Sequence, residues 1–194
     1  MRVAIADYGA GNLRSVCSAF ERAGAEPVVT NDLRAAPLAV VAGVGNASSA
    51  AVELERRGIA EQLRERVAAG RPVLGICLGM QLLFGDSEEG GRGLGLLGGE
   101  VVRLRARQVP HMGWNTLAVA SSDVLEGLDG ADVYFAHSFA AADAEGVVAT
   151  VEHDGPVVAA VERGALAGVQ FHPERSGAAG ARILGNVLRW SSAA

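Results

Sequence analysis

The sequence contains no lysine, and arginine supplies all 17 of its basic residues. The absence of lysine excludes a lysine Schiff base and a phosphate-binding loop that depends on a lysine. With 22 acidic residues the net charge is −5, which disfavours a nucleic-acid surface, where a basic stripe is expected. We therefore expect neither lysine-dependent chemistry nor a nucleic-acid partner.

Long apolar runs and paired cysteines are also lacking. No run approaches the roughly 18 apolar residues of a membrane-spanning helix, and Asp7 interrupts the first apolar segment before the core of a signal peptide can form. Two cysteines, Cys17 and Cys77, are too few for a disulfide framework. We therefore expect a cytoplasmic protein, with a single globular domain spanning residues 1–194.

One of the two cysteines stands in a distinctive local pattern. Gly75 and Gly79 flank Cys77 at a distance of two residues, directly after the apolar run Pro72–Leu74. A sharp turn from strand to helix crowds the backbone, so its flanking positions must lack side chains. Such a turn holds a cysteine beside the free N–H groups of a helix, which favour the thiolate. The pattern predicts a nucleophilic Cys77, and the alternative is a small buried residue before a helix.

A cysteine nucleophile needs a base, and the base needs a group that orients it. His172 lies just beyond the predicted strand Ala165–Phe171, which Pro173 is expected to end. Glu174 is close enough in sequence to reach the imidazole and fix its tautomer. Cys77, His172 and Glu174 are therefore predicted to form a catalytic triad. The alternative is a surface histidine next to a solvated charge.

The pattern of apolar segments predicts an α/β fold, an open, mainly parallel mixed sheet flanked by helices, of the flavodoxin-like sandwich type. In the first half, strands are expected at Arg2–Ala6, Glu26–Thr30, Leu38–Ala42 and just before Cys77, and a helix within Ser48–Ala69. After residue 100, short segments predict antiparallel hairpins and then a helix around Gly177–Trp190. Their strands are Glu100–Arg105, Thr116–Ala120, Asp132–Ala136, Gly146–Glu152, Val157–Glu162 and Ala165–Phe171.

The first predicted helix and the turn before it contain a second cysteine and a partial glycine motif, and we expect neither a reactive group nor a nucleotide site there. Cys17 falls on the apolar stripe that begins at Leu13 and ends at Phe20, so we expect it in the core. Gly9 and Gly11 supply only part of a dinucleotide-binding motif, because the third glycine is missing. We therefore predict no nucleotide site here.

The segments around Cys77 and at Phe171–Glu174 resemble the class I, or triad, glutamine amidotransferases. Other segments are similar to the glutaminase subunits of imidazole glycerol phosphate synthase, namely Asp7–Val16, Pro110–Asn115, Tyr134–Phe139 and Glu174–Gly177. They occur in the same order as in that family. Together the matching segments extend from residue 5 to about residue 188, so the resemblance covers nearly the whole chain.

The resemblance implies that the chain hydrolyses glutamine to glutamate and ammonia through a thioester on Cys77, with no cofactor and no metal. His172 would move the protons, and Glu174 would hold the imidazole. Oxyanion donors are expected in the backbone of Leu78 and of the loop Gly43, Val44 and Gly45, which is alternatively a plain turn. Ala42 stands where the family commonly has proline.

The resemblance also implies how glutamine is held. The residues expected to bind its amino-acid end are Gln81, Glu89, Ser138 and Phe139. Glu89 is alternatively part of a solvated acidic turn, because three further polar or acidic residues precede it.

A partner follows from the same resemblance, a (β/α)8-barrel cyclase that uses the ammonia to make imidazole glycerol phosphate and AICAR in histidine biosynthesis. The two subunits would form a heterodimer with a dry route for ammonia. The residues expected to face the cyclase are Asn12, His111, Met112, Trp114, Asn115, Tyr134 and Arg175. Trp114 and Tyr134 are alternatively core aromatics, and Arg175 replaces a lysine that is frequent in the family.

Three other hypotheses remain open from the sequence. The chain could feed ammonia to a guanylate, anthranilate or pyridoxal phosphate synthase, although Asp7–Val16 and Pro110–Asn115 favour the cyclase. It could be a non-catalytic module that retains the fold. It could also be a cysteine hydrolase that acts on peptides or thiol adducts.

Overall fold

The central sheet has eight strands in the order β2-β1-β3-β4-β13-β12-β11-β8 in a computed structural model, which describes residues 1–193. Five strands are parallel, and they are β1 (Arg2–Ala6), β2 (Glu26–Thr30), β3 (Leu38–Gly43), β4 (Val73–Cys77) and β13 (Leu166–Val169). Three antiparallel strands extend the sheet, and they are β12 (Pro156–Arg163), β11 (Val147–Glu152) and β8 (Ala118–Val119). The predicted open, mainly parallel mixed sheet is confirmed.

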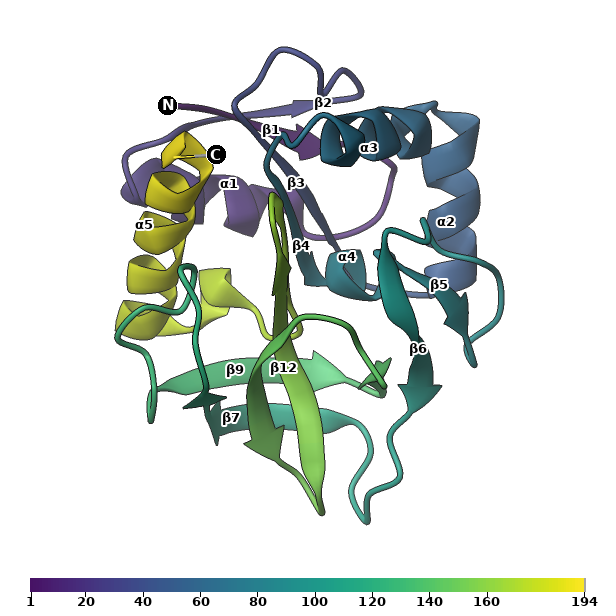
Figure 1. Cartoon of the computed structure of the whole chain (residues 1–194), viewed down its shortest axis with the longest axis vertical. Coiled ribbons are helices and arrows are strands. Elements are labelled where there is room, and N and C mark those ends of the chain that lie inside the picture. The colour runs from purple at the N-terminus through teal and green to yellow at the C-terminus, as the bar shows by residue number, and fades with distance from the viewer. Residues whose placement is uncertain (194) are drawn as a thin grey trace.

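Helices cover both faces of this sheet (Figure 1). The first core contains residues of α1 (Leu13–Arg22) and α5 (Gly177–Ala193), and the second contains residues of α2 (Ala47–Arg56) and α3 (Ile59–Ala68). Because the inner strands are covered on both faces, every residue of β3, β4 and β13 is buried. Within residues 1–193, no helix is long and apolar enough to cross a membrane.

Two helices replace the single helical region predicted within Ser48–Ala69. Gly58 separates α2 from α3 and has a φ of 67°, a left-handed conformation that interrupts a helix. The new helix then starts at Ile59. The sequences of α2 and α3 both have the apolar spacing of a helix, so the break at Gly58 was not predicted.

A small three-stranded sheet forms beside the main one. Its strands are β5 (Phe84–Ser87), β6 (Leu97–Arg103) and β10 (Phe139–Ala142). The middle strand, β6, is parallel to β5 and antiparallel to β10. Sequence patterns indicated β6 with shifted bounds and did not indicate the other two strands.

A two-stranded ribbon crosses the lower end of the molecule in Figure 1. It consists of β7 (His111–Thr116) and β9 (Asp132–His137), which pair antiparallel with Trp114 opposite Tyr134. The strand predicted at Thr116–Ala120 is present only as the two residues of β8, Ala118 and Val119, and β7, which ends at Thr116, was not predicted. We refer to β7 and β9 as the ribbon.

Candidate active site

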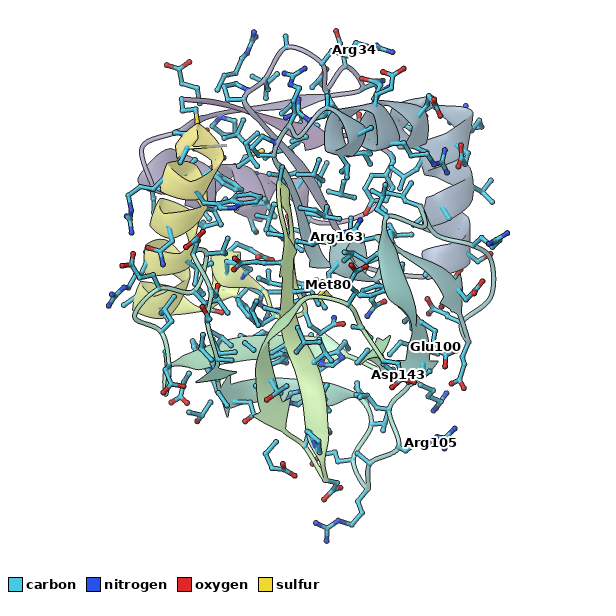
Figure 2. The ribbon with its side chains drawn as sticks, in the orientation of Figure 1. Arg34, Met80, Glu100, Arg105, Asp143 and Arg163 are labelled. Atoms are coloured by element: carbon cyan, nitrogen blue, oxygen red, sulfur yellow. The ribbon has the colours of Figure 1, made fainter. Side chains whose placement is uncertain are left out.

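Cys77 is the last residue of β4 and precedes the short helix α4 (Leu78–Gln81). Its φ of 52° and ψ of −108° are unusual for a residue with a side chain. A Cβ at Gly75 would lie 2.7 Å from the carbonyl oxygen of Gly79, and a Cβ at Gly79 would overlap the carbonyl oxygen of Val41. The turn is therefore possible only because both flanking residues are glycine. Figure 2 shows Met80, in this helix, within the interior of the molecule.

His172 and Glu174 lie beyond β13, at the 3₁₀ helix η1 (Pro173–Arg175). Nδ1 of His172 is 2.8 Å from Oε1 of Glu174, and the two side chains are only 5% and 9% exposed. On the other side of the ring, Nε2 is buried and makes no hydrogen bond to residues 1–193. β13 ends at Val169, so Pro173 begins η1 and does not end the strand as predicted.

The charges around His172 favour its protonated form. Burial lowers the pKa of His172, but interaction with the Cys77 sulfur and the hydrogen bond to Glu174 outweigh burial and raise the pKa to about 10. The Cys77 sulfur and the Glu174 carboxylate are thus the two groups that favour the imidazolium form of His172. This arrangement suits a cysteine nucleophile whose histidine supplies a proton.

Cys77 lines a cavity of about 230 Å³. Most residues predicted for the oxyanion and glutamine sites line the same cavity, and they are Val44, Gly45, Leu78, Gln81, Glu89, Ser138 and Phe139. Met112, expected at the partner interface, and His137, for which no role was predicted, also line it. Gly43 instead lines a small neighbouring cavity together with Asn12, His172 and Glu174.

The predicted oxyanion loop begins next to the nucleophile. Gly43 ends β3 and is paired in register with Cys77 in the neighbouring strand β4. The hydroxyl of Tyr8 donates a hydrogen bond to the carbonyl oxygen of Ala42 at 3.0 Å, and a Cβ at Gly43 would overlap that hydroxyl. Val44, the next residue, is exposed. The loop therefore starts from a tightly packed residue and continues at the surface.

Glu89 is hydrogen-bonded to the N-terminus of α2, the helix that follows this loop. Its Oε2 accepts a hydrogen bond from the backbone N–H of Ala47, the first residue of α2, at 2.6 Å. A carboxylate at a helix N-terminus is favourable because of the unpaired N–H groups there. Glu89 lies in a turn, as the alternative has it, but it is half-buried and hydrogen-bonded to a helix N-terminus.

Four of the residues expected to face the partner form a group at the surface. Met112 and Trp114 are 60% and 58% exposed. The rings of Trp114 and Tyr134 meet edge to face at 6.1 Å, and the guanidinium of Arg175 lies 4.2 Å from the centre of the Tyr134 ring. Trp114 is therefore not a core aromatic. We refer to Met112, Trp114, Tyr134 and Arg175 as the ribbon patch.

The other three expected interface residues are placed differently. His111 is the first residue of β7, and its side chain is buried on the inner face of the ribbon, away from the exposed face. Asn115 is half-buried and its Nδ2 lies 3.1 Å from Nε2 of His111. Asn12 is exposed just before α1, and its side chain donates to the hydroxyl of Ser15.

A chain of hydrogen bonds joins His111 to the Cys77 cavity. Nδ1 of His111 lies 3.0 Å from Nε2 of His137, and Nδ1 of His137 lies 2.9 Å from the carbonyl oxygen of Phe139. Burial lowers the pKa of both histidines to about 4, so both are neutral at pH 7. Since a carbonyl only accepts, His137 donates from Nδ1 and accepts at Nε2. Sequence patterns did not indicate this buried pair.

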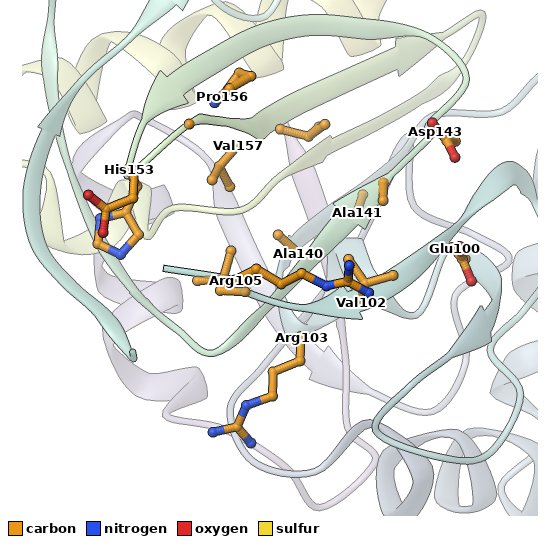
Figure 3. Close-up of a pocket in the computed structure, with 15 residues that line it drawn as sticks. Glu100, Val102, Arg103, Arg105, Ala140, Ala141, Asp143, His153, Pro156 and Val157 are labelled. Atoms are coloured by element: carbon orange, nitrogen blue, oxygen red, sulfur yellow. The ribbon is translucent and has the colours of Figure 1, made fainter. Parts of the chain in front are cut away.

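A larger cavity, of about 490 Å³, lies elsewhere, between β6, β10 and the β11–β12 hairpin. Figure 3 shows Arg105 lying across it and His153 at one edge. The ring of His153 stacks on His111 with centroids 4.1 Å apart. None of the residues predicted for catalysis or glutamine binding lines this cavity, so its size does not make it the active site.

The geometry agrees with comparisons to known proteins. The model of the family "Glutamine amidotransferase class-I" matches residues 4–189. The imidazole glycerol phosphate synthase subunit HisH of Mycolicibacterium paratuberculosis is 48% identical, with 95% of each chain covered. The HisH subunit of Geobacillus kaustophilus is 46% identical, with 96% of this chain and 95% of the relative covered.

Solved structures show the same fold at lower identity. A crystal structure of a glutamine amidotransferase superposes with a TM-score of 0.79 at 21% identity, and 98% of each chain is covered. The fold, the family model and the relatives agree, and the chain belongs to the class-I glutamine amidotransferase family, in the group of HisH subunits of imidazole glycerol phosphate synthase.

Proposed function

We propose that this chain is the glutaminase subunit of imidazole glycerol phosphate synthase. It hydrolyses glutamine to glutamate and ammonia, and a cyclase subunit uses the ammonia to make imidazole glycerol phosphate and AICAR in histidine biosynthesis. The observation that carries the proposal is the meeting of Cys77 with the hydrogen-bonded pair His172 and Glu174, in a chain 48% identical to a HisH subunit.

The proposed reaction has two steps. The Cys77 thiolate attacks the side-chain carbonyl carbon of glutamine, and the imidazolium of His172 gives its proton to the departing nitrogen, which leaves as ammonia. Neutral His172 then takes a proton from water as the water attacks the thioester, and glutamate leaves. The second step restores the thiolate and the imidazolium. Glu174 keeps the Nδ1 proton of His172 in place throughout.

The oxyanion formed in each step needs donors that are already in position. We assign this role to the backbone N–H of Leu78 and to the loop Gly43, Val44 and Gly45. Loss of one such donor typically costs about 2.7–4 kcal/mol of transition-state stabilisation. The amino-acid end of glutamine is assigned to Gln81, Glu89, Ser138 and Phe139, which line the cavity with Cys77.

The cyclase is proposed to be a (β/α)8 barrel that docks on the ribbon patch. This patch combines an exposed tryptophan, a tyrosine and an arginine, the residue types that most often dominate binding energy at interfaces. Met112 belongs both to the patch and to the lining of the Cys77 cavity. A partner bound there therefore lies next to the site where ammonia is released.

A coupled assay tests the proposal. The chain is mixed with the cyclase and its phosphoribosyl ligand, and glutamate formation is measured. We expect glutamine turnover to rise by orders of magnitude, and we expect Cys77→Ala to abolish it while ammonia-driven synthesis by the complex continues. A chain that ignores the cyclase but responds to another synthase contradicts the proposal.

Covalent labelling separates this proposal from a non-catalytic module. A glutamine-directed alkylating analogue is expected to label Cys77 and to spare Cys17. Burial, followed by the nearby Glu21 charge, raises the pKa of Cys17, and its side chain packs against the core, so it is poorly reactive. Equal labelling of both cysteines is the contrary result.

A further inference from the structure

Gln170 is completely buried although it is polar, and it lies between Cys77 and Gln81. Its Nε2 is 3.7 Å from Sγ of Cys77, and its Oε1 is 3.1 Å from Nε2 of Gln81. Its backbone N–H donates to the carbonyl of Ala159 in β12 at 2.8 Å. The residue is therefore held by its backbone and by both ends of its side chain.

The hydrogen bonds determine which way each amide points. Nε2 of Gln81 lies 2.8 Å from the carbonyl oxygen of Phe139, which can only accept, so the NH₂ group of Gln81 must face it. The atom of Gln170 that contacts this NH₂ group must then be its oxygen. The NH₂ group of Gln170 is therefore the end that faces the Cys77 sulfur.

The side-chain amides of Gln81 and Gln170 therefore each direct one hydrogen-bonding group toward the active site. Gln81 uses both of its amide hydrogens, on Phe139 and on Gln170, so its carbonyl oxygen is the acceptor left for a ligand in the Cys77 cavity. Gln170 directs an N–H at the sulfur. A hydrogen bond to the charged form of a group favours that form, so this donor favours the thiolate.

Gln170 and His172 come from one short segment that follows β13. The chain bends at Gln170 and Phe171, and His172 has φ of −106° and ψ of 96°. Both side chains reach Cys77 from this segment, Gln170 as a neutral donor and His172 as the charged partner.

We propose that Gln170 donates a hydrogen bond that stabilises the Cys77 thiolate, and that the same amide positions Gln81 for glutamine. The kinetic consequences rest on the proposed glutaminase function, whereas the bond to sulfur does not. Gln170 thus couples the reactivity of the nucleophile to the orientation of a substrate-binding side chain.

Two substitutions separate these roles, and a third is a matched control. Gln170→Met keeps the size of the side chain and removes both hydrogen bonds. Gln170→Glu keeps an oxygen for Gln81 and replaces the N–H donor with a carboxylate oxygen, whose charge also opposes the thiolate. Gln62→Met is the control, because Gln62 is also a buried glutamine, with bonds to Leu33 and Asn31, and it contacts none of the site residues.

The main measurement is the rate at which iodoacetamide alkylates Cys77 as a function of pH, in full-length chains that carry Cys17→Ala. Both Gln170 substitutions are expected to move the midpoint of this profile to higher pH by about one to two units, the usual effect of losing a hydrogen bond to a charged group. At pH values below the wild-type midpoint the rate falls about tenfold to a hundredfold. Gln62→Met is expected to leave the midpoint unchanged.

Steady-state kinetics in the complex with the cyclase then distinguish the two contacts. The kcat for glutamine falls in both Gln170 variants. KM for glutamine rises only in Gln170→Met, because only that variant leaves Gln81 without its second acceptor. Ammonia-driven synthesis is expected to stay at the wild-type rate and shows that the variants are folded and assembled.

An unchanged alkylation midpoint in the folded Gln170 variants overturns the proposal, and so does an equal shift in Gln62→Met. If Gln170→Met fails to fold, an unchanged midpoint in Gln170→Glu still overturns the proposal. Alkylation does not depend on turnover. A wild-type complex that does not hydrolyse glutamine therefore contradicts the proposed function and leaves the test of Gln170 valid.

Discussion

The backbone N–H of His172 donates a hydrogen bond to the carbonyl oxygen of Tyr134 at 2.9 Å. Ser176 closes the same contact, since its hydroxyl donates to the carbonyl of His172 at 2.7 Å and accepts from the N–H of Tyr134 at 3.0 Å. Tyr134 belongs to the ribbon patch and lies under Arg175. The proposed docking surface and the proposed base are thus joined through the main chain, with no intervening element.

Loss of the Ser176 hydroxyl is expected to weaken this junction. Ser176→Ala leaves the N–H of Tyr134 and one lone pair of the His172 carbonyl without their partner in a buried site, which costs about 1–3 kcal/mol. We expect glutamine turnover in the complex to fall about tenfold, while ammonia-driven synthesis is retained. Ser191→Ala is the control, because Ser191 is also a buried serine, lies in α5 and is away from the site. An equal loss in the two variants contradicts the prediction.

Glu174→Gln is expected to change the pH dependence of the reaction. Because the Glu174 carboxylate helps to raise the pKa of His172, its removal lowers that pKa from about 10. The imidazolium must protonate the leaving ammonia, so the alkaline limb of the kcat/KM profile moves to lower pH. The loss at pH 7 is expected to be smaller than that of His172→Ala. Glu100→Gln, at an exposed position, serves as the control and leaves the profile unchanged.

Gly43→Ala is expected to destabilise the chain and to reduce glutaminase activity together. The added Cβ overlaps the hydroxyl of Tyr8, which is fully buried and bonded to Ala42. Overpacking of this kind costs about 1–3 kcal/mol, measurable by urea unfolding. Adding Tyr8→Phe removes the clashing oxygen and restores most of the stability. Gly85→Ala, where the new Cβ finds its nearest neighbour at 3.8 Å, is the tolerated comparison.

Trp114→Ala is expected to weaken binding of the cyclase by about 2 kcal/mol or more, which raises Kd roughly thirtyfold. The reason is that Trp114 is the largest exposed apolar side chain of the ribbon patch. Titration calorimetry measures the change. Val52→Ala, at an exposed position on α2, controls for loss of apolar surface elsewhere. Unchanged affinity in the tryptophan variant removes the ribbon patch as the docking site.

The nucleophile could be predicted because its constraints are local. The turn at Cys77 needs two bare positions within five residues, and Gly75 and Gly79 satisfy that need in the sequence. His172 and Glu174 are likewise only two residues apart. Their approach to Cys77 depends on β4 and β13 being neighbours in the sheet, which no local pattern specifies.

In the ribbon, β9 was predicted as Asp132–Ala136, but β7 could not be predicted from the usual rule that apolar residues are buried. In β7 the large apolar residues Met112 and Trp114 point outward, while the polar His111 points inward. A search for strands that bury their apolar residues therefore does not find β7.

Gln170 was missed because its side-chain partners come from distant parts of the chain. The contacts of Gln170 lie 89 and 93 residues away along the chain. The one local signal is a glutamine placed between Val169 and Phe171, both buried, in a segment that otherwise reads as core. A polar residue at such a position needs buried partners, and here they are the nucleophile and a substrate-binding side chain.

Cys77 and Glu174 line two different cavities. Cys77 lines the cavity of about 230 Å³, and Glu174 lines the small neighbouring cavity together with His172. We expect glutamine to bind in the Cys77 cavity and to contact the sulfur there. His172 and Glu174 are almost inaccessible to bulk solvent. We therefore expect His172 to exchange protons with the bound reactants during turnover, whereas in the free enzyme it equilibrates with solvent and sets the pH profile.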